Sequence, residues 1–347
     1  MSNRRNSSIE LLRIIAMLMI ILGHLAGHGV LQMAQENVGS LWIGGGLLNK
    51  LFSIFLLPGG RIGVGIFFLI TGYFQIEKND AKILKVVSVT LFYGFFIGIV
   101  GIIVGGISLG SIVRGLMPLS TSTWWYVSTY IVLMIASPWI NGKFNQLNRS
   151  KKIITLILCW LLAYLLPYIL SATYYSITRC LLFYLLGAYI KTEIDVLSLS
   201  KHKILFSAIC VISWLAYIPC GYYFYQYQLN KTITGIIVDG CIYNGLIVPI
   251  CSTSIFCIFV CLKEFNNTAI NKIASTTFGI YLLHDNYLRS WLWNLVIKVP
   301  QLYQNPLFPL LALIMVMLIF VACGLIDAIR NIFFEVIKRR RIFFIWD

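Results

Sequence analysis

The sequence predicts an all-α integral membrane protein of about ten transmembrane helices, with both termini in the cytoplasm. Composition is the first observation: 59% of the 347 residues are hydrophobic and 11% are charged, whereas soluble domains average about 25% charged residues. The mean hydropathy of +0.86 agrees. The second observation is that apolar runs follow one another along the whole chain. No polar block is long enough for a soluble domain, so we expect residues 1–347 to form one polytopic membrane domain.

A spanning helix needs about 20 mostly apolar residues, and ten runs of the chain are candidates. The first run is longer than the apolar part of a signal peptide and carries internal charges, so we interpret it as a transmembrane helix. The second contains Pro58 and two glycines before Arg61, which predicts a break, with the span proper beginning near Arg61. The expected spans are 9–30, 53–76, 85–107, 124–141, 153–170, 174–191, 203–225, 236–262, 274–296 and 305–330.

Basic residues in the connections orient these spans. With the N-terminus inside, 19 basic residues lie on the cytoplasmic side and 5 on the outer side, and the alternation holds at every connection. The net charge of +15 is then mostly topological signal and attraction to anionic lipid, not a nucleic-acid surface. Residues 331–347 are expected to form a short basic cytoplasmic tail. The inner set is Arg4, Arg5, Lys78, Lys82, Lys85, Lys143, Arg149, Lys151, Lys152, Lys191, Lys201, Lys203, Lys263, Lys272, Arg330, Lys338, Arg339, Arg340 and Arg341; the outer set is Lys50, Arg61, Arg114, Lys231 and Lys298.

The first span carries polar residues that are costly in lipid, namely Glu10, Arg13, His24 and His28. Eleven residues separate Arg13 from His24, which is about 20° more than three full helical turns, so both lie on one face, about 16 Å apart along the axis. Glu10 and His28 extend the same stripe at spacings of three and four residues. Either Arg13 reaches the inner headgroups and pairs with Glu10, or the stripe faces a functional cavity.

The ninth span carries a second polar group: His284, Asp285, Asn286 and Arg289. A histidine beside carboxylate and amide groups is held in one tautomer and tuned by them. The alternative is a polar cluster that closes the outer ends of the helices.

Three further stretches carry candidate binding residues. Arg61 precedes a run with Phe67, Phe68, Thr71 and Gly72, where Gly and Thr are also typical of close helix packing. Trp124, Trp125 and Tyr126 are expected at an outer interface, where an aromatic belt is the alternative. Asp239 and Arg179 lie in outer parts of their spans, and they pair with each other or with a ligand.

These stretches resemble four motifs of the membrane acyltransferase-3 family, in the family's order, from residue 9 to about 290. The likeness is loose in each motif and fairly specific in all four together. The chain departs from the family at Gly65 and Ile66, where an acidic residue is common, and at Thr123, where a histidine is common. The matching residues are Arg13 with His24; Phe67, Phe68, Thr71 and Gly72; Trp124 to Tyr126 with Pro138; and Tyr281, Leu282 and His284.

The resemblance implies a bacterial plasma-membrane O-acyltransferase, without the SGNH domain that some members carry. It implies transfer of an acetyl or similar group from cytoplasmic acyl-CoA to a hydroxyl of a surface carbohydrate, such as exopolysaccharide or capsule, or of a lipid-linked glycan. His24, Arg13 and His284 are the expected catalytic residues, with His24 as general base or acyl carrier. The expected substrate-binding residues are Glu10, Arg61, Thr71, Trp124, Trp125, Tyr126, Asp285, Asn286 and Arg289.

Two rival functions share the prediction of intramembrane charges: a transporter or flippase for polysaccharide or lipid-linked sugar, and a glycan polymerase. Neither needs acyl-CoA, and no internal repeat supports a transporter. The nine cysteines form no CxxC pair and lie in apolar runs, so we interpret them as packing residues. No metal cofactor is expected.

Overall fold

The described part of the chain forms helices and no strands, as the sequence predicts. The computed structural model describes residues 5–31, 45–104, 110, 113, 117, 124–165, 175–226 and 238–339. The first half contains α1 (Ser7–His24), the π-helix η1 (Leu25–Leu31), α3 (Leu47–Leu56), α4 (Pro58–Tyr73), α5 (Asp80–Ile103), α7 (Trp125–Asn145) and α8 (Arg149–Tyr164). The second half contains α10 (Tyr175–Glu193), α11 (Val196–Ser200), α12 (Lys203–Gln226), η3 (Val238–Ile247), α14 (Val248–Val260), α15 (Thr268–Ser275), α16 (Thr277–His284), η4 (Trp291–Val296), α17 (Val299–Gln304) and α18 (Phe308–Arg339).

Six helical stretches of the described residues are long and apolar enough to cross a membrane. Helices α7, α8 and α10 occupy three more of the expected spans, but they do not qualify by length and composition, so the count of about ten stays a prediction. The six stretches are Ser7–Leu31, Leu47–Tyr73, Asp80–Ile103, Lys203–Phe224, Ile242–Val260 and Phe308–Ile337.

The predicted start of the second span near Arg61 is wrong. Helices α3 and α4 join through Leu57, whose backbone is helical (φ −52°, ψ −46°), so one helical stretch runs from Leu47 to Tyr73. Pro58 is the first residue of α4 and has no N–H for the Ile54 carbonyl, which accepts a hydrogen bond from the Leu57 N–H instead (3.3 Å), so the chain passes from α3 into α4 without leaving helical geometry. Lys50, expected in an outer loop, lies in the first turn of α3.

The ninth span, expected as one helix over 274–296, is also wrong. The chain instead forms α15 and α16, leaves helical geometry at Asp285 (φ −124°, ψ 88°), and resumes as η4. The Asn286 side chain accepts a hydrogen bond from the Leu288 N–H (2.8 Å) and donates one to the Leu283 carbonyl (2.7 Å). These local bonds offer the backbone an alternative to a continued helix, which is why asparagine favours helix ends.

The last span is longer than expected, since α18 continues to Arg339 rather than ending at residue 330. The predicted cytoplasmic tail over 331–347 is therefore helical in its first nine described residues, and residues 340–347 lie outside the described part.

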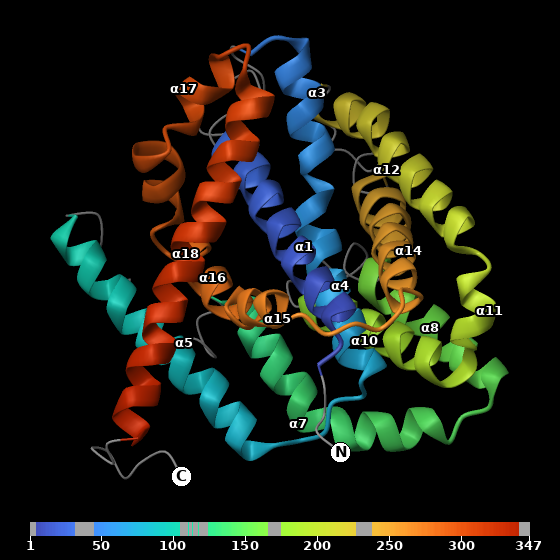
Figure 1. Cartoon of the computed structure of the whole chain (residues 1–347). Helices are drawn as coiled ribbons and strands as arrows, with labels where there is room; N and C mark the ends of the chain where they lie inside the picture. The colour runs from blue at the N-terminus through green and yellow to red at the C-terminus, as the bar shows by residue number, and fades with distance from the viewer. Residues whose placement is uncertain are drawn as a thin grey trace.

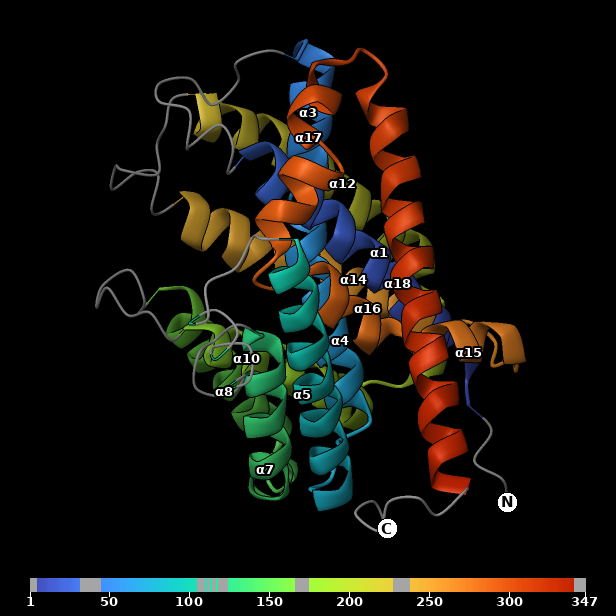
Figure 2. The ribbon, with the colours of Figure 1, turned by 90° about the vertical axis from the view of Figure 1, so that its left-hand side faces the viewer.

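Basic residues from the predicted inner set and from the predicted outer set lie at opposite ends of the helix bundle. In both ribbon views the start of α5, the end of α7 and the end of α18 lie at one end of the molecule, while α3 and α17 lie at the other (Figures 1 and 2). The first end carries Lys82 and Lys143, from the predicted inner set, and the second carries Lys50 and Lys298, from the outer set. Which end faces the cytoplasm stays a prediction, and Arg114 and Lys231 lie outside the described residues.

Helix α1 runs through the middle of the bundle beside α4 (Figure 1). The two backbones approach closely through small residues: a methyl group on Gly63 would overlap the Ala16 carbonyl, and one on Gly23 would overlap the backbone of Gly60. Helix α4 packs as closely against α10, because a methyl on Gly72 would overlap the Tyr184 carbonyl. These contacts confirm the packing interpretation of the glycines around the second span.

A buried carboxylate fixes α16 against its neighbours. Asp327 of α18 is 1% exposed and accepts hydrogen bonds from Tyr93 Oη of α5 (2.7 Å), Arg330 Nε (2.9 Å) and Asn331 Nδ2 (3.0 Å). The same carboxylate fills the space beside Gly279 of α16, where a Cβ would overlap it. This contact sets the position of α16, whose last residue is His284.

Candidate active site

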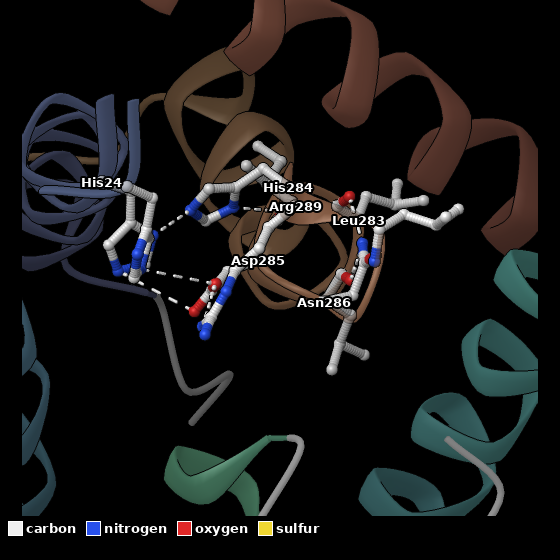
Figure 3. A network of polar contacts seen from close by, with 10 residues as sticks. His24, Leu283, His284, Asp285, Asn286 and Arg289 are labelled. Carbon is white, nitrogen blue, oxygen red and sulfur yellow. Dashed lines mark hydrogen bonds and ion pairs between the residues drawn. The ribbon is translucent and has the colours of Figure 1, made fainter. Parts of the chain in front are cut away.

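Two histidines that are 260 residues apart in the sequence meet at the ends of α1 and α16. His24 is the last residue of α1 and His284 the last residue of α16. Their facing ring nitrogens, His24 Nδ1 and His284 Nε2, are 3.0 Å apart, and the rings stack with centroids 5.1 Å apart (Figure 3). The two side chains therefore form one hydrogen-bonded unit.

The backbone decides which nitrogens of this unit carry protons. His284 Nδ1 lies 2.7 Å from the carbonyl oxygen of Ile280, which only accepts hydrogen bonds, so Nδ1 carries the proton and donates it. In the neutral ring His284 Nε2 is then an acceptor, and His24 Nδ1–H must be the donor across the 3.0 Å contact. His24 Nε2 is left with its lone pair, which makes it the basic atom of the site.

The Asp285 carboxylate lies opposite that lone pair. Its Oδ2 atom is 3.8 Å from His24 Nε2, and its Oδ1 atom is 4.0 Å from His28 Nε2 and 3.7 Å from Arg289 Nη1 (Figure 3). Asp285 is 7% exposed, and Oδ1 has no hydrogen-bond donor within reach among the described residues. A positive charge formed on His24 would be stabilised by this carboxylate.

Access to the group comes from the side of α1 and η1. His284 is fully buried, whereas the side chains of His24 and His28 are 20% and 27% exposed. The site thus has a closed wall behind His284 and is partly open at His24 and His28. Helix η1 continues α1 toward α3, α17 and η4, which places His24 nearer that end of the molecule, as the sequence predicts.

A series of aromatic rings connects the histidines to the region of Arg13. Tyr281 lies 6.3 Å from the His284 ring and 5.4 Å from the ring of Tyr126 on α7. Arg13 lies within electrostatic range of Tyr126 and Tyr130. Because α1 is one regular α-helix from Ser7 to His24, Arg13 and His24 face the same side of it, as the eleven-residue spacing predicts.

A family model described as an acyltransferase domain matches residues 6–326 of the chain. The chain belongs to the acyltransferase-3 family. The matched range contains Arg13, His24 and His284, so the resemblance seen in the motifs is confirmed, and the protein is an acyltransferase with the apolar helices of a multi-pass membrane protein. Neither a curated protein nor a solved structure matches the chain.

Arg13 of this acyltransferase pairs weakly with its own helix. Its Nη1 atom lies 3.8 Å from Glu10 Oε2, the contact that the three-residue spacing predicts. Its Nε atom is buried without a hydrogen-bond acceptor among the described residues. The guanidinium therefore keeps donors for a further anion.

Several predicted binding residues contact backbone or other helices instead of the histidine group. Asn286 points away from His24 and bonds its own segment (Figure 3), and Thr71 Oγ1 donates to the Phe67 carbonyl (2.7 Å). Arg61 donates to Asn244 Oδ1 (2.5 Å) and lies over the Tyr243 ring, 5.1 Å from its centroid. Their roles in substrate binding stay predictions.

The aromatic triplet divides between two environments. Trp124 is fully buried and lies 6.5 Å from the Tyr287 ring, and Tyr126 lies 5.1 Å from Phe68, so both face the protein interior. Trp125 is 36% exposed, so of the three it alone suits an aromatic belt.

Arg179 lies over the Tyr164 ring, 5.1 Å from its centroid, while the side chain of Asp239 lies outside the described part, so their predicted pairing stays open.

Sequence reasoning set aside two residues that the structure brings into the site. His28 lies on the predicted polar stripe of the first span, but it is not among the predicted catalytic or binding residues. Tyr281 was matched to the family motif and given no role of its own. The four-residue spacing of His24 and His28 was the available signal for the first, and the three-residue spacing of Tyr281 and His284 on one helix face for the second.

Proposed function

We propose that this acyltransferase moves an acetyl or similar acyl group from cytoplasmic acyl-CoA to a hydroxyl of a surface carbohydrate, in the plasma membrane of a bacterium. The observation that carries the proposal is the hydrogen-bonded pair of His24 and His284, which leaves a lone pair on Nε2 of His24, a side chain that is 20% exposed. Acyl transfer to a hydroxyl needs such a base, because an alcohol is a poor nucleophile until its proton is removed.

The step uses His24 as general base. The carbohydrate oxygen attacks the thioester carbonyl carbon while its proton passes to His24 Nε2. The tetrahedral intermediate then collapses, the carbon–sulfur bond breaks, and the CoA sulfur takes the proton back from His24. Asp285, 3.8 Å from Nε2, stabilises the imidazolium that forms in between.

His284 acts as a positioning residue. Both of its ring nitrogens are engaged, Nδ1 with Ile280 and Nε2 with His24, so it has no N–H to offer to an oxyanion. It holds the His24 ring in the tautomer that leaves Nε2 unprotonated. Arg289, whose side chain is 46% exposed, is the charged group beside the site that suits orientation of the acceptor.

Arg13 suits the donor. Arginine binds phosphate with paired donors, and CoA carries several phosphates. Arg13 lies about 16 Å along the helix from His24, a distance that an extended pantetheine arm covers. In this proposal the start of α1 lies at the cytoplasmic face, and His24 lies deeper, toward the outer face.

Replacement of His24 tests the proposal. His24→Ala in purified protein should abolish acyl transfer from labelled acetyl-CoA to the glycan, while the variant inserts and accumulates normally. His202→Ala, on an exposed turn, is the matched control and should keep full activity. Normal O-acylation by His24→Ala would refute the role of His24 as general base. Transport of the glycan without any requirement for acyl-CoA would favour a flippase instead.

The same lone pair would serve as nucleophile if the acyl group first moved to His24. Trapping of labelled acyl-protein in the absence of acceptor, and its loss in His24→Ala, distinguishes this route from direct transfer.

A further inference from the structure

His24, His28 and Asp285 bring three potential metal ligands together at the open side of the site. One ligand atom from each lies within 4.8 Å of the others, the one such group found among the described residues. Two of the separations are 3.8 Å, from His24 Nε2 to Asp285 Oδ2, and 4.0 Å, from His28 Nε2 to Asp285 Oδ1. Nothing in the proposed acyl transfer uses His28.

The chemistry of this set suits a divalent transition metal. Two histidines four residues apart on one helix face are a recurrent zinc-binding pair, and an aspartate completes three ligands of a tetrahedral site. Zinc binds imidazole nitrogen and carboxylate oxygen at about 2.0–2.2 Å, so neighbouring ligand atoms lie about 3.3 Å apart. The two separations from Asp285 need to shorten by about 0.5 and 0.7 Å, and the His24–His28 separation, which is within 4.8 Å, by at most about 1.5 Å; side-chain rotation supplies this.

The surroundings of His24 and Asp285 favour metal binding by both side chains. The Ile280 carbonyl and His284 hold the proton of His24 on Nδ1, so Nε2 faces Asp285 with its lone pair. A metal-binding histidine commonly donates its other N–H in this way, which fixes its ring. Asp285 is more than nine-tenths buried, and its Oδ1 atom is aimed into the group without a hydrogen bond among the described residues.

One cation competes for the same carboxylate. Arg289 Nη1 lies 3.7 Å from Asp285 Oδ1, but its side chain is 46% exposed and reaches solvent by rotating outward. The partial exposure of His24 and His28 provides the path by which an ion enters. It also keeps the fourth coordination position of the ion open to water.

We propose that His24 Nε2, His28 Nε2 and the Asp285 carboxylate bind one Zn²⁺ ion, and that the bound ion blocks acyl transfer. The block follows because the ion occupies the lone pair that takes the hydroxyl proton. This consequence rests on the proposed function of His24, whereas zinc binding itself does not.

Metal binding is measured first, on the full-length protein purified in detergent and stripped with a chelator. Equilibrium dialysis with Zn²⁺ should find one more tightly held ion per chain in the wild type and in His202→Ala than in His28→Ala. Affinity at this site should fall by at least about tenfold in His28→Ala and in Asp285→Asn. His28→Phe keeps a ring and serves if the alanine variant accumulates poorly.

Spectroscopy distinguishes metal binding at this site from metal binding by the cysteines. Co²⁺ substituted for Zn²⁺ should give the visible bands of nitrogen and oxygen ligation, without the near-ultraviolet thiolate band that cysteine ligation produces. Equal zinc binding by the wild type and His28→Ala, or a thiolate band that His28→Ala leaves unchanged, would overturn the proposed site.

Inhibition is measured second. Zn²⁺ should inhibit wild-type acyl transfer at the concentrations at which it binds. In His28→Ala, measured against that variant's own rate without zinc, the inhibiting concentration should rise by at least about tenfold. Loss of sensitivity in this variant also excludes zinc captured by the CoA thiol. Zinc binding without inhibition, or stimulation of acyl transfer by zinc, would overturn the proposal that the bound ion blocks acyl transfer. If His24→Ala still transferred acyl groups, the proposed function would fail while the dialysis result stood.

Discussion

Replacement of His284 by phenylalanine separates the positioning role from simple packing. Phenylalanine keeps a ring against His24 and Tyr281, whose centroids lie 5.1 and 6.3 Å from that of His284. It removes Nε2, the acceptor that holds the His24 Nδ1–H at 3.0 Å. Glutamine is the matched variant, because its side-chain oxygen reaches about the position of Nε2 and accepts the same hydrogen bond.

The size of the effect follows from the lost hydrogen bond. When His24 becomes protonated in the transition state, its Nδ1–H bond to His284 is charge-assisted and worth about 1.5–3 kcal/mol. Each 1.36 kcal/mol is tenfold in rate, so His284→Phe should lower kcat by about 10- to 160-fold. This loss is smaller than the abolition expected for His24→Ala, because the base itself remains.

The assay is the release of CoA from acetyl-CoA by purified protein with saturating glycan acceptor. His284→Gln should recover most of the rate that His284→Phe loses, with similar KM values in both. A wild-type kcat in His284→Phe would refute the tautomer argument. Equal losses in the two variants would show that the ring, and not its Nε2 atom, supports His24.

Five further variants test contacts away from the histidine pair. Arg13→Ala should raise the KM for acetyl-CoA by about 10- to 100-fold, the worth of a charge-assisted phosphate contact, and an unchanged KM would exclude a phosphate-binding role. Gly63→Ala should lower the free energy of unfolding by about 1–3 kcal/mol, measured by thermal denaturation in detergent, because its methyl overlaps the Ala16 carbonyl. The added methyl group of Gly60→Ala would lie 3.8–3.9 Å from its nearest neighbours, so this variant should be tolerated. Equal losses of unfolding free energy in Gly63→Ala and Gly60→Ala would contradict the packing of α1 on α4. Asp327→Ala should lower the free energy of unfolding by about 3–5 kcal/mol, because it leaves Arg330, whose side chain is 11% exposed, without its carboxylate. Tyr93→Phe should lower it by about 1 kcal/mol. The reverse order would refute the role of the buried carboxylate.

Part of the site was predictable from local periodicity. The eleven-residue spacing of Arg13 and His24 placed both on one face of the first helix, and the structure has them facing the same set of rings. The pairing of Glu10 with Arg13 was predictable from their spacing of three residues. Such spacings suffice because the geometry of a helix depends only on its own backbone.

The break after His284 was not predictable from hydropathy. Residues 274–296 are apolar enough for one helix, yet the side chain of Asn286 satisfies backbone groups locally and ends α16 at His284. Because of this ending, Asp285 leaves the helix and faces the two histidines of α1 and η1, while Asn286 turns away. Hydropathy averages over a window and carries no information on such bonds.

By itself the sequence determined the class of the protein: a helical membrane chain whose motifs belong to an acyltransferase family and whose polar residues include His24 and His284. Only the tertiary structure decided that these two histidines share a hydrogen bond, which nitrogen keeps its lone pair, and that Asp285 lies opposite it. The physical reason is distance along the chain. A contact across 260 residues depends on how closely α1 and α4 pack at their glycines and on how Asp327 fixes α16. The periodicity of a single helix predicts neither of these contacts between helices.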